Sequence, residues 1–101
     1  MTKYCITNGF IFDNGKSIDL KNINGSDIRV QAIGTGKFKV NGKLTANSTA
    51  KTLSLIRLKD FAIEEEIEDN EIYACDITGF YSVSTENVTG IDKVYAAIYS
   101  N

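Results

Sequence analysis

Histidine, proline and tryptophan are all missing from this chain of 101 residues. Histidine is the side chain whose ordinary pKa lies nearest neutral pH, and it is the commonest metal ligand in proteins. Without it, Ser-His-Asp and Cys-His nucleophilic sites and the usual zinc enzymes are excluded. A glycosidase-type pair of carboxylates needs a cleft, which so small a domain rarely forms. We therefore expect a protein that is not an enzyme, with no catalytic residue, cofactor or metal.

Cysteine is scarce as well. Cys5 and Cys75 are the two cysteines of the chain, and they form no Cys-x-x-Cys pair. Each lies among apolar neighbours, where an unpaired cysteine behaves as a small buried hydrophobic residue. The sequence therefore predicts two reduced, buried thiols, and a single bridge between them is the alternative.

Long apolar runs and dense basic clusters are also absent. No stretch approaches the roughly 18 apolar residues of a membrane-spanning helix, and residues 1–6 lack the apolar core of a signal peptide. The net charge is −2, from 11 basic and 13 acidic residues. The closest approach to a basic patch is the alternating set Lys37, Lys39 and Lys43, which is typical of the solvent face of a strand. We expect a soluble, cytoplasmic protein that binds neither membranes nor nucleic acid.

Turn chemistry is abundant in the first half of the chain. Both central residues of a type I′ turn need positive φ, which asparagine tolerates and glycine adopts freely. With five tyrosines and five phenylalanines, and with many β-branched residues, this composition predicts a small antiparallel all-β protein. The Asn-Gly pairs are Asn8-Gly9, Asn14-Gly15, Asn24-Gly25 and Asn41-Gly42.

The clearest hairpin is predicted around Asn41-Gly42, between residues 37–40 and residues 43–45. An opening hairpin is expected through Asn14-Gly15, between residues 9–12 and 17–20. Residues 27–33 alternate as a half-buried strand that ends in a turn or bulge at residues 34–36. The side chains expected to be buried in these strands are Ile28, Val30, Ala32, Phe38, Val40 and Leu44.

The second half of the chain is less regular. Residues 51–58 and 59–68 each allow a strand or a helix, and the β-rich context favours strands. Residues 71–78, 80–84 and 94–99 alternate as closing strands, with turns at Thr78-Gly79 and Thr89-Gly90. The last strand is apolar on both faces, so it is either central in a sheet or covered by a partner subunit.

These patterns amount to eight or nine short strands with turn signals between them. We predict an antiparallel β-sandwich, of jelly-roll or immunoglobulin-like type, with a small β-barrel as the alternative. No linker or repeat divides the chain, so residues 1–101 are expected to form one domain.

The strongest charge feature is the acidic segment 64–71, with Glu64, Glu66 and Glu68 as its interaction candidates. The segment lacks the Asp-x-Asp-x-Asp-Gly loop of a calcium site. A solvated sheet edge that blocks unwanted strand pairing is the favoured interpretation. A docking surface for a basic partner is the alternative.

Three tyrosines near the closing strands, Tyr81, Tyr95 and Tyr99, are candidates for an interface or a ligand site. A row of tyrosines can stack on sugar rings or anchor a protein interface. Packing into the core, with the hydroxyl group reaching solvent, is the competing explanation.

The closing segment also resembles a known family. Residues 72–80 read Ile-Tyr-Ala-Cys-Asp-Ile-Thr-Gly-Phe, residues 81–84 read Tyr-Ser-Val-Ser, and residues 93–99 read Lys-Val-Tyr-Ala-Ala-Ile-Tyr. They resemble the closing strands of β-sandwich accessory proteins of tailed-phage virions, which carry a tyrosine, two residues and Asp-Val-Thr/Ser-Gly-aliphatic. Residues 36–42 are similar to the Gly-x-Phe-x-Val-x-Gly strand of those domains. The resemblance spans about residues 28–99.

The resemblance implies a structural or assembly protein of a phage-like particle, such as a capsid decoration, head fibre or tail accessory protein. Its partners would be copies of itself or a larger virion protein, and it would be made in the cytoplasm of a bacterial host. Symmetric oligomers are expected for such components. A carbohydrate-binding module that uses surface tyrosines is the alternative, and a cytosolic inhibitor with an acidic docking segment is a third.

Overall fold

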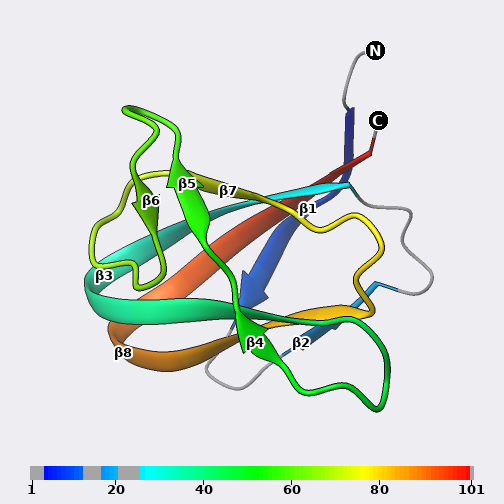
Figure 1. The fold of residues 1–101 in the computed structure, drawn as a ribbon. Helices are drawn as coiled ribbons and strands as arrows, with labels where there is room; N and C mark the ends of the chain where they lie inside the picture. Colours follow the sequence, from blue (N-terminus) through cyan, green and yellow to red (C-terminus); the bar gives the residue numbers. More distant parts are fainter. Residues whose placement is uncertain (1–3, 13–16, 21–25, 101) are drawn as a thin grey trace.

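All of the regular structure is β-strand in the computed structural model, which describes residues 4–12, 17–20 and 26–100. Figure 1 shows the strands wrapped around one another in two layers. Within these residues there is no helix long and apolar enough to cross a membrane. The strands are β1 (Tyr4–Phe12), β2 (Ser17–Asp19), β3 (Asp27–Lys43), β4 (Lys51–Thr52), β5 (Leu55–Arg57), β6 (Ile63–Glu64), β7 (Tyr73–Asp76) and β8 (Ser82–Ser100).

The two longest strands, β3 and β8, form the backbone of the fold. They pair antiparallel from Asp27 opposite Tyr99 to Lys43 opposite Ser82. The register shifts several times between Ile33 and Lys39, and Gly34 has a φ of 123°, which glycine tolerates and other residues rarely adopt. Such bulges bend a strand and increase its twist. Residues 34–36 therefore form the predicted bulge, and Figure 1 shows both strands curving there.

This bend places the two halves of β3 and β8 in different layers. One layer follows the order β1, β8, β3, β7, β5 and β6, using residues 27–33 of β3 and 94–100 of β8. In the other, β2 pairs with residues 82–84 of β8, and β4 pairs with residues 41–42 of β3. The layers pack together as an antiparallel β-sandwich, which confirms the predicted fold class; they do not close into the alternative barrel.

The core lies between the two layers. The alternation predicted for residues 27–33 is confirmed, because Ile28, Val30 and Ala32 are fully buried. Phe38 and Val40 are also fully buried, as predicted. Among the side chains that the structure describes, the buried apolar residues are Leu20, Ile28, Val30, Ala32, Phe38, Val40, Leu55, Ile67, Tyr73, Ile77, Val83, Val94, Ala96 and Ile98.

The hairpin predicted at Asn41-Gly42 is wrong. Both residues lie inside β3, where they pair with Ser84 and Val83 of β8. The Asn41 side chain is buried, and its Oδ1 accepts a hydrogen bond of 2.9 Å from the Thr52 hydroxyl. The chain turns a few residues later, so Leu44, predicted to be buried, is 64% exposed. The pair supplies a small residue and a buried amide rather than a turn.

Of the other three Asn-Gly pairs, the structure describes one. Asn8-Gly9 lies inside β1, next to a register shift between Thr7 and Phe10. Asn14-Gly15 and Asn24-Gly25 fall outside the described residues. The flanking strands of the expected opening hairpin pair with opposite ends of β8, so in the described part of the chain they do not form that hairpin.

The closing segments also differ from their prediction. Residues 80–84 and 94–99 belong mostly to one continuous strand, β8, and Thr89-Gly90 lies within it rather than in a turn. The turn at Thr78-Gly79 is confirmed, with φ of 82° at Gly79. Strand β8 is central, with β1 on one side and β3 on the other, as its apolar faces suggested.

The ambiguous middle of the chain is extended. Residues 51–58 contain β4 and β5, and residues 59–68 contain β6 and a bridge from Ile67 to Phe38. Neither segment is helical, and the strand interpretation is confirmed only for these short elements, because residues 58–60 form a turn. The backbone N–H of Phe38 donates to Ile67 at 3.0 Å, and that of Ile67 donates to Phe38 at 2.9 Å. These bonds hold the acidic segment against β3.

Cys75 is a free, half-buried thiol on β7 that packs against the core. Burial, followed by the nearby charges of Asp76 and Asp27, raises the pKa of the thiol to about 11. With its pKa raised, the thiol stays protonated at neutral pH and lacks the reactive thiolate form, so we interpret Cys75 as a packing residue. Cys75 is therefore unpaired, as predicted, but half-buried rather than buried, and the side chain of Cys5 falls outside the described ones.

Candidate functional site

Alternation along β8 and β3 turns one set of side chains away from the core. Ala96 and Ile98 of β8 are buried, so Tyr95 and Tyr99 point to the opposite face of the sheet. In the same way Arg29 and Gln31 of β3 face outward, because Val30 between them is buried. We call this side of the β1-β8-β3-β7-β5-β6 layer the outer face.

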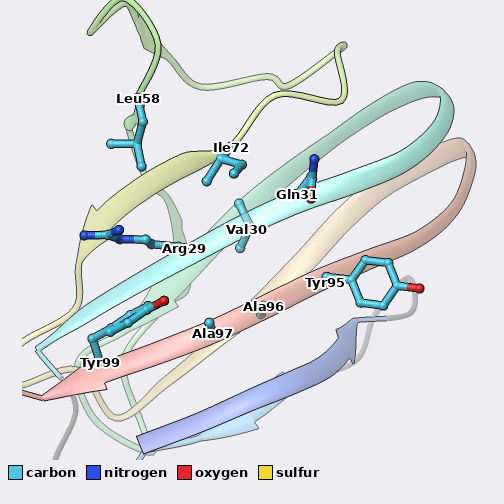
Figure 2. Close-up of a pocket in the computed structure, with 9 residues that line it drawn as sticks. All are labelled: Arg29, Val30, Gln31, Leu58, Ile72, Tyr95, Ala96, Ala97 and Tyr99. Carbon is cyan, nitrogen blue, oxygen red and sulfur yellow. The ribbon is translucent and has the colours of Figure 1, made fainter. Parts of the chain in front are cut away.

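A shallow hollow of about 290 Å³ lies on the outer face. Figure 2 shows Tyr95 on one side of it and Leu58 and Ile72 on the other, with β3 running between them. A backbone hydrogen bond connects the two residues on the side opposite Tyr95: the N–H of Leu58 donates to the carbonyl of Ile72 at 2.9 Å. The lining residues are Arg29, Val30, Gln31, Leu58, Ile72, Tyr95, Ala96, Ala97 and Tyr99.

Arg29 is held in place at one end of the hollow. Its guanidinium carbon lies 4.9 Å from the centre of the Tyr99 ring, within the range of a cation–π contact. Its Nε lies 3.5 Å from the carboxylate of Asp27, on the same face two residues earlier. The charge of Arg29 is therefore partly balanced within the protein, and one side of the Tyr99 ring is occupied.

Exposed apolar side chains on the outer face extend beyond the hollow. Ile56 of β5 lies opposite Ile63 of β6 and Ala74 of β7, and Ala74 lies opposite Arg29 of β3. These pairings make one row of side chains across the sheet, with Ile72 and Tyr95 in the next row. The large apolar residues on this face, with exposures from 39% to 68%, are Ile33, Ile56, Ile63, Ile72 and Tyr95.

Two of the three tyrosine candidates therefore come together, and one does not. Tyr95 and Tyr99 line the same hollow. Tyr81 precedes β8 at its other end, where its backbone N–H donates to Lys43 at 2.7 Å and its carbonyl accepts from Leu20. The three do not form one row. The isoleucines of the outer face were not singled out, although residues 27–33 and 71–78 alternate, because alternation within a strand does not show which neighbouring strands bring such side chains together.

The acidic candidates Glu64, Glu66 and Glu68 come together in a second hollow, of about 540 Å³. Strand β6 ends the strand order of its layer, so the segment lies at a sheet edge, as the sequence suggested. The Lys37 ammonium lies 3.6 Å from both Glu66 and Glu68 and balances part of their charge. The hollow is lined by Arg57, Glu64, Glu66, Glu68, Asp69 and Tyr73.

Arg57 braces this region. Its Nε and one terminal nitrogen bind the two carboxylate oxygens of Asp60 at 2.9 and 3.0 Å, and its other terminal nitrogen binds Asp69 at 2.9 Å. The Tyr73 hydroxyl donates to the same Asp69 oxygen at 3.2 Å. The fork to Asp60 holds the turn after β5, in which Phe61 adopts a φ of 61°.

These contacts shift the pKa of both carboxyl groups and of the Tyr73 hydroxyl. The hydrogen bonds from Arg57, and then from the Ala62 N–H, lower the pKa of Asp60. Burial acts to raise the pKa of Asp69, but hydrogen bonds from the Glu71 N–H, Arg57 and Tyr73 outweigh it and lower the pKa. Burial, followed by the charge of Asp69, raises the pKa of Tyr73. The two carboxylates are therefore structural anions.

We expect Arg57→Gln to reduce the loss of folding stability that occurs when the pH is lowered. Both carboxyls have folded pKa values below the ordinary 3.8, so their stabilisation is complete above that pH and is lost as pH falls through the folded values. Urea unfolding midpoints between about pH 6 and pH 2 should therefore fall steeply for the natural protein and less steeply for Arg57→Gln. An identical pH profile for the two proteins would contradict this account of Arg57.

The acidic hollow holds no metal-binding arrangement. Across the described residues, no three or more aspartate, glutamate or cysteine side chains are placed to ligate one ion. Buried side-chain nitrogen and oxygen atoms there all have hydrogen-bond partners. What the described surface offers is an apolar face for contact and an acidic edge beside it.

Comparison with known proteins shows what fold this is. No family model and no curated protein matches the chain. The SPBc2 prophage-derived protein YomS has the same fold: the TM-score is 0.72 at 20% identity, over 98% of this chain and 92% of YomS. The PBSX exported protein XepA matches with a TM-score of 0.73 at 18% identity, over 98% of this chain but 37% of XepA. The sandwich is therefore a fold found in phage-derived proteins.

Proposed function

We propose that this chain is a non-enzymatic structural or assembly protein of a phage-like particle, and that it acts through protein–protein contacts. Its partners are copies of itself or a larger virion protein. It is made in the cytoplasm of a bacterial host and joins the particle there. A capsid decoration, head fibre or tail accessory protein fits this description.

The outer face carries this proposal. It places isoleucine and tyrosine side chains on a broad sheet surface, and the core of a protein interface is enriched in aromatic residues and depleted of charge. Exposed apolar patches of this kind mark interaction sites on soluble proteins. The shared fold with a prophage-derived protein supports the particle as the setting.

A carbohydrate-binding role is the second candidate, because Tyr95 and Tyr99 line one hollow. The stacking of Arg29 on Tyr99 favours the protein–protein role, since that side of the ring is not open to a sugar. A glycan array separates the two: binding that Tyr95→Ser abolishes would support the carbohydrate role and contradict the proposal.

The direct test is to purify particles from cells that carry the gene, by density gradient, and to detect the chain in them. We expect it to co-sediment with the particles in a fixed ratio to the major shell or tail protein. A chain that stays entirely in the soluble fraction, while intact particles sediment without it, would overturn the proposed function.

A further inference from the structure

We propose that the outer face is a self-association interface, through which two copies of this chain pack face to face about a two-fold axis. This inference rests on the proposed function and names the surface and the partner. A two-fold interface uses the same patch on both copies, so the patch must be compatible with itself in both charge and shape.

The charge of the outer face meets the first requirement. Arg29 is the charged residue among those that line the hollow, and it is already paired with Asp27 and stacked on Tyr99. Burial of an unpaired charge at an interface is costly. Packing against an identical hollow would therefore bury only this already balanced charge, while Asp76, opposite Asp27, lies at the end of the face. A partner selected by opposite charge would instead suit the acidic hollow, at the edge of the layer.

The shape of the face meets the second requirement. The hollow lies over β3, with Tyr95 on one side and Ile72 and Leu58 on the other (Figure 2). A two-fold axis close to Gln31 would set the exposed Tyr95 ring of each copy against the Ile72 side of the other. Two sheets that pack in this way lie about 10 Å apart with their strands within about 30°.

The extent of the face predicts how tight the dimer is. The face spans five strands at a spacing of about 4.8 Å and roughly 3.3 Å per residue. Strands β3 and β8 contribute about seven residues each, and β7, β5 and β6 contribute four, three and two. That is roughly 360 Å² on each copy and roughly 730 Å² for the pair, which is the size of a weak, transient contact. We therefore expect a weak dimer that forms with rising concentration and dissociates on dilution.

The experiment is sedimentation equilibrium of the whole chain from about 1 µM to about 1 mM, a range that brackets micromolar dissociation. We expect a reversible monomer–dimer equilibrium. Ile72→Lys and Tyr95→Ser should each weaken it by about tenfold or more. Both positions are exposed, so the variants should keep the far-UV spectrum and the thermal midpoint of the natural protein.

Leu44→Lys is the matched control, because Leu44 is also an exposed apolar residue but lies in the turn after β3, away from the outer face. It should leave the dimer unchanged. A strict monomer at the highest concentration would overturn the inference, and so would equal weakening by Leu44→Lys or no weakening by Ile72→Lys.

The outcome is separable from that of the proposed function. A monomer that still sediments with particles, and loses that property in Ile72→Lys, would overturn self-association and leave the particle role standing. A dimer that Ile72→Lys disrupts, but that is missing from purified particles, would support the interface and overturn the particle role.

Discussion

Replacement of Phe38 by alanine is expected to lower the free energy of unfolding by about 3–5 kcal/mol. Phe38 is fully buried between the two layers, on the half of β3 that lies beyond the bulge. Truncation of its ring removes apolar area from the core and leaves a cavity that the surrounding strands fill only in part. Urea unfolding at neutral pH, followed by circular dichroism, measures the loss.

Phe61→Ala is the control for this prediction. It makes the same chemical change at a side chain that is 75% exposed, so it should shift the free energy of unfolding by less than about 0.5 kcal/mol. If the two variants lost similar amounts of stability, the position of the core between the layers would be contradicted.

Gly42→Ala is expected to lower the free energy of unfolding by about 1–3 kcal/mol, the cost typical of overpacking. A Cβ atom at Gly42 would overlap the ring of Phe80 and lie 3.2 Å from a methyl group of Leu53. Phe80 cannot easily move away, because its N–H donates to Ile77 at 3.1 Å and its ring packs against the core. Thermal and urea unfolding both report the loss.

A double-mutant cycle with Phe80→Ala tests the cause. With the ring removed, the added methyl group should cost little, and the reduced freedom of the unfolded chain even favours alanine by about 0.4–1 kcal/mol. An unchanged cost of Gly42→Ala in the Phe80→Ala background would show that the ring is not the obstacle. Far-UV spectra of the four proteins check that all are folded.

Gly42 also shows where sequence reasoning reached its limit. Asn-Gly permits a type I′ turn because both residues tolerate positive φ. Both residues can also adopt the extended conformation of a strand, so the pair does not require a turn. In the folded protein the pair sits in a strand, where the missing side chain makes room for Phe80, 38 positions further along the chain. A contact between residues so far apart in the sequence cannot be recognised from the local residue pattern. The Asn-Gly pair therefore predicted a turn that does not form.

The sequence predicted only part of the hollow on the outer face, because the rest depends on contacts between residues far apart in the chain. Alternation identified Tyr95 and Tyr99 as a pair on one face of the last strand, and the structure places both at one hollow. The other side of that hollow comes from Leu58 and Ile72, which reach it through the order of β7 and β5 in the sheet. Strand order is not local information, so no pattern in residues 55–74 predicted it.

By itself the sequence determined the class of fold and the inward-facing residues of its best strands. The two-residue period of Ile28, Val30 and Ala32 is a local property of an extended chain, and burial of one face follows from it. The tertiary structure alone decided that β3 and β8 run unbroken past their Asn-Gly and Thr-Gly pairs, bend at the bulge and join the two layers. It also decided that isoleucines from β5, from β6 and from the position just before β7 meet the tyrosines of β8 on one outer face. Those outcomes depend on pairing between residues far apart in the chain, and the energy of such pairing is felt only when the strands are side by side.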